Sequence, residues 1–234
     1  MSLNHSPAIV TDGLVLCLDA ANQRSYSGSG SSFVDLSNNG NNGTLTNQAQ
    51  FNSANRGVID LDGTDDYIDV GSDLISGTNN KFTISFWIVP DALTGFNQNI
   101  ALCGWGSNGI GSNGLVIYFA GSQSSSKVWV QKNANGQHTL NGNAYAPTVG
   151  EWFNWVYTSD TSSNQQISYI NGKYLSSQTA GAAPGSSGSL RFGASQTSEK
   201  GDLNGRMNNL MFYNRALTAD EVRQNYEATV GRYV

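Results

Sequence analysis

Alternation of hydrophobic and polar positions runs through much of this chain and predicts β-strands along most of its length. In the clearest case, KFTISFWIV at residues 81–89, every second residue from Phe82 to Ile88 is apolar. A period of two places these side chains on one face of a half-buried strand. Similar segments, bounded by turn-forming residues, lie at residues 14–19, 114–120, 127–132, 137–140, 152–158, 166–170, 173–177, 190–194 and 206–213. We therefore expect about a dozen strands.

One hairpin has a strong local signal. Asn171-Gly172 separates the segments 166–170 and 173–177, and both residue types accept the positive φ angles of a two-residue turn. We therefore expect these two segments to pair directly.

Near the end of the chain the pattern changes to that of a helix. Thr218 and Glu221 have the spacing of a capping box, and Leu217 and Val222 that of a hydrophobic staple. These residues predict a helix at about residues 219–228, which we expect to lie as a lid over one end of the sheet core.

The domain organisation follows from the same pattern. Strand signals continue on both sides of the Gly/Ser/Ala stretch at 180–189, so this stretch is predicted to be a loop and not a linker. With 38% hydrophobic residues, the 234-residue chain has enough apolar side chains for a full core. We expect one domain over residues 1–234, with residues 1–10 as a loose N-terminal arm. Its predicted fold class is all-β, a two-sheet antiparallel sandwich with one short C-terminal helix.

Charge and composition exclude several classes of partner. The net charge of −5 argues against nucleic-acid binding, which needs a basic face. No segment is apolar over the length needed to span a bilayer, so we expect no membrane insertion. The N-terminal sequence does not resemble a secretory signal. Two cysteines allow at most one disulfide, and Cys17, within a strand segment, is expected to be a small buried hydrophobe.

Six segments, taken in order, resemble the laminin-G-like family of concanavalin A-like jelly-roll domains. The resemblance implies a jelly-roll sandwich for nearly the whole chain. It leaves the function open, because the family includes lectins, adhesion modules, add-on domains of enzymes and virion proteins. The segments are GLVLCLDA (13–20), DLSNNGNNGTL (35–45), LDGTDDYIDV (61–70), KFTISFWIVP (81–90), GEWFNWVYTSD with ISYINGKYLSS (150–160 and 167–177), and NGRMNNLMFYNRALTADEV (204–222).

The composition of the loops points to one group within this family. Their Asn, Gly and Ser content and the turn DGTDDY at 62–67 resemble domains in structural proteins of tailed phages, marine ones especially. This implies a non-enzymatic virion protein: a capsid decoration, head-fibre or tail-associated module, assembled in the host cytoplasm. Its partners would be other virion proteins, in a homo-oligomer or another symmetric assembly. The alternative is a soluble, carbohydrate-binding lectin or adhesin at the extracellular surface, with a host-surface glycan as ligand and with or without calcium.

The chain offers little for catalysis. Glycoside hydrolysis needs two carboxylates at a fixed separation. None of the glutamates falls in the Glu-x-Asp-x-Glu alternation of relatives that hydrolyse glycans; they are Glu151, Glu199, Glu221 and Glu227. The two histidines are His5, in the predicted arm, and His138, among polar neighbours. We therefore expect no enzymatic activity.

A calcium site is the main cofactor hypothesis. The resemblance to laminin-G-like domains implies a rim site formed by Asp19, by Asn42 of the loop 38–43, and by Asn208. Relatives tend to carry Asp where this chain has Asn208, and calcium prefers several carboxylates among its ligands. We therefore expect no cofactor to be required, with calcium at this rim as the alternative. Asp19 would otherwise bind backbone N–H groups of the next loop.

A glycan site needs an aromatic platform with polar neighbours. Trp105, in the glycine-rich segment CGWGSNGIGSNG, is either a loop anchor or a stacking surface, and Asn108 and Asn113 lie nearby in sequence. The sequence does not decide whether Trp129 lies on the core face or the outer face of its strand. The other strand tryptophans are expected in the core: Trp87, Trp152 and Trp155.

Five aspartates lie between Asp60 and Asp69, and we interpret this run as a hairpin turning at residues 63–66. The flanking strands would then pair directly, with Asp60 opposite Asp69 and with four apolar side chains on the inner face: Ile59, Leu61, Ile68 and Val70. Like charges in direct opposition destabilise a strand pair. We therefore predict that both acids point outward and are either solvated or close to a Lys or Arg.

Overall fold

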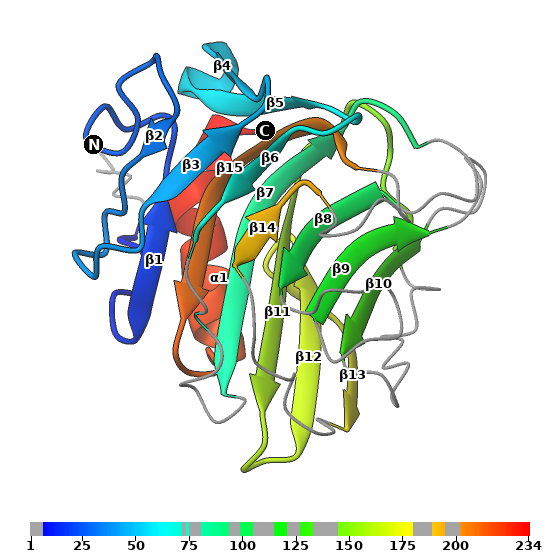
Figure 1. The fold of residues 1–234 in the computed structure, drawn as a ribbon. Coiled ribbons are helices and arrows are strands. Elements are labelled where there is room, and N and C mark those ends of the chain that lie inside the picture. Colours follow the sequence, from blue (N-terminus) through cyan, green and yellow to red (C-terminus); the bar gives the residue numbers. More distant parts are fainter. Residues whose placement is uncertain are drawn as a thin grey trace, which may run out of the picture.

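The computed structural model describes residues 7–71, 74, 81–93, 99–104, 115–120, 127–132, 145–179, 189–194 and 202–234. Within them, two antiparallel sheets are stacked face to face and one helix, α1 (Ala219–Thr229), lies behind the larger sheet (Figure 1). This architecture confirms the predicted two-sheet, all-β sandwich with a short C-terminal helix.

The eight-stranded sheet follows the order β13 (Lys173–Thr179), β12 (Gln165–Ile170), β11 (Phe153–Asp160), β7 (Phe82–Pro90), β15 (Asn204–Tyr213), β5 (Val58–Asp62) and β4 (Gln50–Asn52), with β1 (Leu14–Leu18) paired to the second half of β15. The seven-stranded sheet follows the order β10 (Lys127–Lys132), β9 (Leu115–Ala120), β8 (Asn99–Gly104), β14 (Leu190–Phe192), β6 (Tyr67–Asp69), β3 (Gly43–Thr46) and β2 (Ser32–Phe33). Short 3-10 turns lie at Ala54–Arg56 and Val230–Arg232.

The main core lies between the sheets. On β7 the four alternating apolar residues, Phe82 to Ile88, all belong to it, as their period of two predicted. The opposite face of this strand is buried as well, so β7 is fully buried and not half-buried. Its Trp87 packs away from the main core, against the C-terminal segment, where its ring stacks on Tyr233 at a centroid distance of 4.2 Å.

The helix forms a third layer on the outer face of the eight-stranded sheet. Its predicted capping box is present: the Thr218 side chain accepts from the Glu221 N–H, and the Glu221 side chain accepts from the Thr218 N–H. The staple residues Leu217 and Val222 pack in one cluster with Cys17 and other outer-face residues. The prediction that the helix covers one end of the core was therefore wrong. The helix lies along the outer face of the sheet, because the apolar side chains there need to be buried. No helix among the described residues has the length and apolarity to cross a membrane.

Residues near the N-terminus are tied into the fold. Cys17 is only 5% exposed, and burial, with the charges of Asp19 and Asp35, raises the pKa of its thiol to about 12, as suits a buried hydrophobe. The prediction of a loose N-terminal arm was wrong for residues 7–10, the part of it that the structure describes. The Val10 N–H donates to Asn225 of α1, and Tyr213 donates to the Val10 carbonyl. Residues 1–6 lie outside the described chain.

The Asn171-Gly172 hairpin is confirmed. Its two turn residues have φ angles of +52° and +71°, and the flanking strands β12 and β13 pair antiparallel. Trp155 is core, whereas Trp152 precedes β11 and is only half-buried against Tyr233. The predicted strand at 137–140 falls outside the described residues.

The acidic run at residues 60–69 is not a hairpin. β5 pairs with β4 and β15 in one sheet, whereas β6 pairs with β3 and β14 in the other, so residues 63–66 cross between the sheets. The four predicted apolar residues still face the core, because both sheets enclose it. Asp60 and Asp69 are partly exposed and each lies opposite an arginine, Arg206 and Arg191 respectively, as predicted for acids needing a basic neighbour.

Candidate functional site

Two of the three predicted calcium ligands, Asp19 and Asn208, lie in contact in the structure. Asn208 is fully buried on β15, where its side-chain oxygen accepts from the Ala20 N–H at 2.7 Å. Its side-chain nitrogen donates to the Gly57 carbonyl at 2.8 Å and to an Asp19 carboxylate oxygen at 3.1 Å. The amide therefore presents its donor group, and not its oxygen, to Asp19.

A cationic side chain of the protein occupies the other side of Asp19. Arg232 donates from one terminal nitrogen to both carboxylate oxygens, at 2.9 and 3.0 Å, and each side chain is only 16% exposed. A calcium ion at Asp19 would have to displace this guanidinium. The residues as arranged do not fit calcium, which takes six to eight oxygen ligands.

The third predicted ligand, Asn42, has a different partner. Its side-chain oxygen accepts from the backbone N–H of Asp35 at 2.9 Å. Asp35 was not singled out from the sequence, yet its carboxylate organises this loop, accepting from the N–H groups of Cys17, Ser37 and Asn41. Such bonds to nearby backbone groups are common for aspartate in loops, so the Asp-x-Ser step was the available signal.

The predicted glycan residues Trp105, Asn108 and Asn113 lie outside the described residues, as does the side chain of Trp129. The backbone of Trp129 pairs with Tyr118 on β9. The predicted glycan site at these residues is therefore not tested by the structure and stays a prediction.

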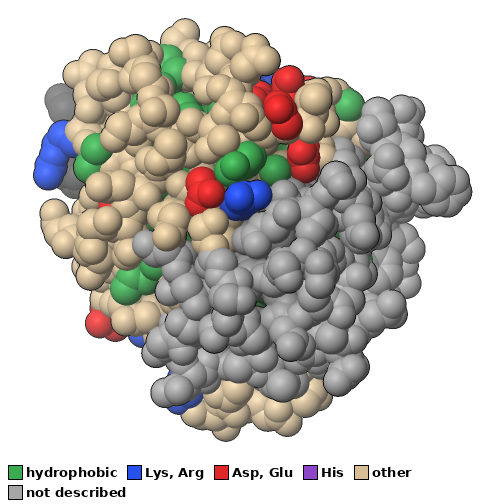
Figure 2. Space-filling view, in the orientation of Figure 1, with side chains coloured by type: hydrophobic (Ala, Val, Ile, Leu, Met, Phe, Trp, Pro, Cys, Tyr) green, Lys and Arg blue, Asp and Glu red, His purple; other side chains and the backbone are tan. Residues whose placement is uncertain are grey.

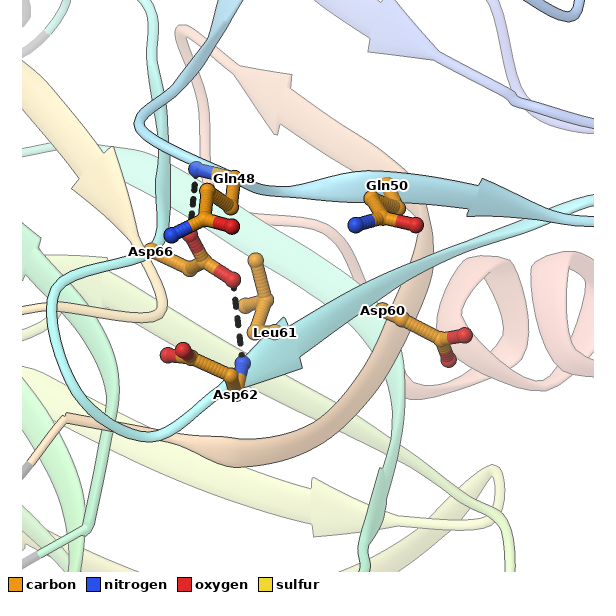
Figure 3. A pocket seen from close by; sticks show the side chains of 6 residues that line it. All are labelled: Gln48, Gln50, Asp60, Leu61, Asp62 and Asp66. Carbon is orange, nitrogen blue, oxygen red and sulfur yellow. Dashed lines mark hydrogen bonds between the residues drawn. The ribbon is translucent and has the colours of Figure 1, made fainter.

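The acidic crossing borders a pocket of about 270 Å³. Figure 3 shows Asp66 between Gln48 and Asp62, with the carboxylate of Asp60 directed away from that pair. Asp66 is only 2% exposed and accepts from the N–H groups of Gln48 at 2.7 Å and of Asp62 at 3.1 Å. Burial raises the pKa of its carboxyl group. One oxygen therefore ties the crossing to the segment before β4 and the other ties it to the end of β5, which is a structural role.

Carboxylate oxygens of Asp62, Asp65 and Asp66 lie within 4.8 Å of one another. Two of these three side chains are exposed, and exposed acids commonly gather without a metal. Because the oxygens of Asp66 already accept backbone N–H groups, we assign no ligand to this cluster.

The outer face of the seven-stranded sheet presents a different combination of side chains. Tyr67 and Asp69 flank the buried Ile68 on β6, and Arg191 lies opposite Asp69 on β14. The Arg191 guanidinium carbon lies 4.4 Å from the centre of the Tyr67 ring, in cation–π geometry. Its Nε lies 3.5 Å from an Asp69 oxygen. All three side chains are partly exposed, Arg191 to 26% and Asp69 to 23%.

Register extends this group into a polar row across the sheet. Thr44 of β3 pairs with Asp69 on the side away from β14, and Ser32 of β2 pairs with Thr44; both are exposed. On the side of β14 away from β6, beyond β8, Val116 and Tyr118 of β9 are almost fully buried, at 5% and 7% exposed. Figure 2 shows blue, red and green side chains together near the centre of this face, over β6 and β14. We call the set Tyr67, Asp69 and Arg191 the front-face cluster.

Sequence reasoning did not single out Tyr67 or Arg191. The available signal was local alternation: each polar or amphipathic residue stands between two buried neighbours, Asp66 and Ile68 for Tyr67, and Leu190 and Phe192 for Arg191. Alternation places each residue on a face, but only the register joins them.

A family model described as Laminin_G_3, Concanavalin A-like lectin/glucanases superfamily, matches residues 62–223. The chain belongs to this family. No curated protein matches the sequence. The family assignment agrees with the lectin-like sandwich and includes both strands of the front-face cluster.

Solved structures show the same fold at low sequence identity. Domain 4 of AbnA, an extracellular GH43 arabinanase from Geobacillus stearothermophilus, solved in complex with arabinotriose, is 17% identical, with a TM-score of 0.67 over 91% of this chain and 98% of that domain. Trypanosoma rangeli sialidase is 17% identical, with a TM-score of 0.70 over 96% of this chain but 34% of the sialidase. The botulinum neurotoxin type G receptor binding domain is 17% identical, with a TM-score of 0.59 over 92% of this chain and 51% of that chain.

Proposed function

We propose that this family member is a carbohydrate-binding module and that the front-face cluster is its glycan-binding surface. The observation that carries the proposal is the grouping of an aromatic ring, a carboxylate and a guanidinium, all partly exposed, on the outer face of the seven-stranded sheet. Sites of this kind combine apolar contact area with a few fixed polar groups. The arabinotriose complex of the AbnA domain shows that a domain of this fold was solved with a bound oligosaccharide, which supports the proposal.

The cluster is preorganised for binding. Asp69 accepts from the Gly71 N–H at 2.8 Å through one oxygen and faces Arg191 through the other. Arg191 is held between this carboxylate and the Tyr67 ring. Because these side chains are already ordered, a ligand would lose little of its binding energy to fixing their rotamers.

A glycan array with the labelled protein, run in chelator, tests the proposal, followed by calorimetry on any glycan that binds. We expect Tyr67→Ala to weaken binding by at least about tenfold, since loss of about 1.4 kcal/mol of aromatic contact has that effect. Tyr174→Ala is the matched control, because Tyr174 is 62% exposed on β13 of the other sheet. Equal affinity of both variants and the wild type would place the glycan elsewhere and refute the front-face assignment.

We further propose that the module binds without catalysis. Asp66 has a raised pKa, but both of its oxygens accept backbone N–H groups, which suits a structural acid better than a proton donor. Incubating each bound glycan with the protein and measuring new reducing ends tests this proposal. Release above the buffer control would overturn it.

For the biological setting we propose display on the particle of a tailed phage, as a decoration, fibre or tail-associated module in a symmetric assembly. Support comes from the loops rich in Asn and Gly and from the crossing DGTDDY at residues 62–67, which resemble phage structural proteins. Mass spectrometry of purified particles tests this setting, and failure to detect the chain in them would refute it. Glycan binding and display on a particle are compatible, so each test stands alone.

A further inference from the structure

Arg191 differs from the other half-buried arginines of the described chain. Arg206, Arg215 and Arg232 each donate hydrogen bonds of 2.6 to 3.0 Å to carboxylate oxygens. Arg191 has only the 3.5 Å approach of its Nε to Asp69, and its terminal nitrogens donate to no described residue. Of its nitrogens only Nε is buried without an acceptor, so the terminal nitrogens face solvent and can donate to a ligand.

The unbonded edge of Arg191 has a defined orientation. The Tyr67 ring supports the guanidinium plane at 4.4 Å, and Asp69 lies on its Nε side. Asp69 is fixed in turn by the Gly71 N–H, so it stays on that side. The two terminal nitrogens are then left as a planar pair of donors, the arrangement that binds a carboxylate through two parallel hydrogen bonds.

We propose that the front-face cluster selects glycans that carry a carboxylate, of the uronic or sialic acid type, and that the terminal nitrogens of Arg191 bind this group. The inference rests on the proposed glycan-binding function and specifies its ligand class. Tyr67 supports the guanidinium and contacts the sugar ring, whereas Asp69 keeps the ligand carboxylate away from the Nε side by repulsion.

Electrostatics favours this class over neutral sugars. A charge-assisted hydrogen bond is about twice as strong as a neutral one, and the bidentate form adds geometric selection. The chain as a whole has a net charge of −5 and repels anions, so an acidic glycan requires a local cation. Binding should therefore weaken as ionic strength rises, because the half-exposed pair is screened by salt.

Matched glycans that differ only in the carboxylate test the proposal. One pair is sialyllactose and lactose; the other is trigalacturonate and its carboxyl-reduced form. We expect the wild type to bind an acidic member at least about tenfold more tightly than its neutral partner, the ratio that corresponds to about 1.4 kcal/mol. The two pairs also distinguish sialic from uronic acids as the source of the carboxylate.

Variants assign the selectivity to Arg191. Arg191→Lys keeps the charge but loses the planar donor pair, so it should lose most of the preference for the acid; Arg191→Gln should abolish it. Arg24→Gln is the matched control, because Arg24 is exposed in a loop and its side chain makes no described interaction. Melting temperatures of all variants would confirm that they fold.

The outcomes separate the two proposals. Equal binding of acidic and neutral partners at a surface that Tyr67→Ala disrupts would overturn the carboxylate inference and leave glycan binding in place. Acid selectivity that survives in Arg191→Gln would also overturn the inference. Absence of binding to every array glycan and to both pairs would overturn the glycan-binding function and the inference with it.

Discussion

The pair formed by Arg232 and Asp19 should determine how the C-terminal segment contributes to stability, and Arg232→Ala tests this. Removing one partner of a buried pair costs about 3–5 kcal/mol, because the other charge stays behind uncompensated. Here both side chains are 16% exposed, so water partly solvates the remaining Asp19 carboxylate. We therefore expect a loss of about 2–3 kcal/mol.

That loss has a measurable size. In a domain of 150–250 residues, 1 kcal/mol shifts the melting temperature by about 2–4 °C. Arg232→Ala should thus melt about 4–12 °C below the wild type by calorimetry. Arg24→Ala, which removes an exposed arginine in the loop after β1, should stay within about 2 °C. Adding Asp19→Asn to Arg232→Ala should recover part of the loss, because it removes the uncompensated charge.

Melting temperatures measured with and without calcium can refute the assignment of Arg232 as the cation beside Asp19. If Arg232 supplies the cation that Asp19 requires, the melting temperature of the wild type should be the same in millimolar calcium and in chelator. A drop in chelator would show that a metal holds this rim and that the guanidinium does not replace it. A melting temperature of Arg232→Ala equal to that of the wild type would refute the reasoning from the other side.

Two other contacts give stability predictions. Hydrogen bonds from Arg215 hold the pKa of Glu221 at about 2, below its ordinary 4.5, so the stabilisation is present above about pH 4.5 and lost as the pH falls towards 2. Glu221→Gln should therefore cost about 1 kcal/mol at pH 7, and its difference from the wild type should vanish over that acid range in melting curves; a constant difference would contradict the assignment. Gly205→Ala would place a Cβ 2.3 Å from the Val89 carbonyl oxygen, so urea unfolding should show a loss above about 2 kcal/mol, whereas Gly231→Ala, with open space around it, should change stability by less than about 0.5 kcal/mol. Similar stabilities of the two glycine variants would show that the backbone yields at Gly205.

The elements that sequence predicted well are those decided within a few residues. The capping box joins Thr218 to Glu221, and the turn at Asn171-Gly172 depends on the φ angles of two adjacent residues. The alternation of β7 likewise places four side chains towards the core. What alternation could not show is that the other face of β7 is covered too. The cover of Trp87 comes from Tyr226 of α1 and from Tyr233, more than a hundred residues further along the chain.

The acidic run shows where local reasoning fails. A short turn between two alternating segments predicts a hairpin, yet β5 and β6 pair in different sheets. The jelly-roll topology sends these consecutive strands to opposite sheets, and no residue between them signals this choice. The inner-face assignment survived the error, because an apolar residue faces the same core from either sheet.

The partners of the two acids at the ends of this run, Asp60 and Asp69, follow only from the register. Asp60 lies opposite Arg206 and Asp69 opposite Arg191, so the same cross-strand pairing of opposite charges is found in both sheets. The sequence shows the acids but not their partners, which lie more than a hundred residues away. The difference between the pairs lies in the arginines: Arg206 also hydrogen-bonds Asp91 at 2.6 Å, whereas the terminal nitrogens of Arg191 have no described acceptor. A pair whose donors are used within the protein is structural, and a pair that leaves donors unused on an accessible face is available for a ligand. This contrast is the reason why we propose the front-face cluster, and not the pair of Asp60 and Arg206, as the binding surface.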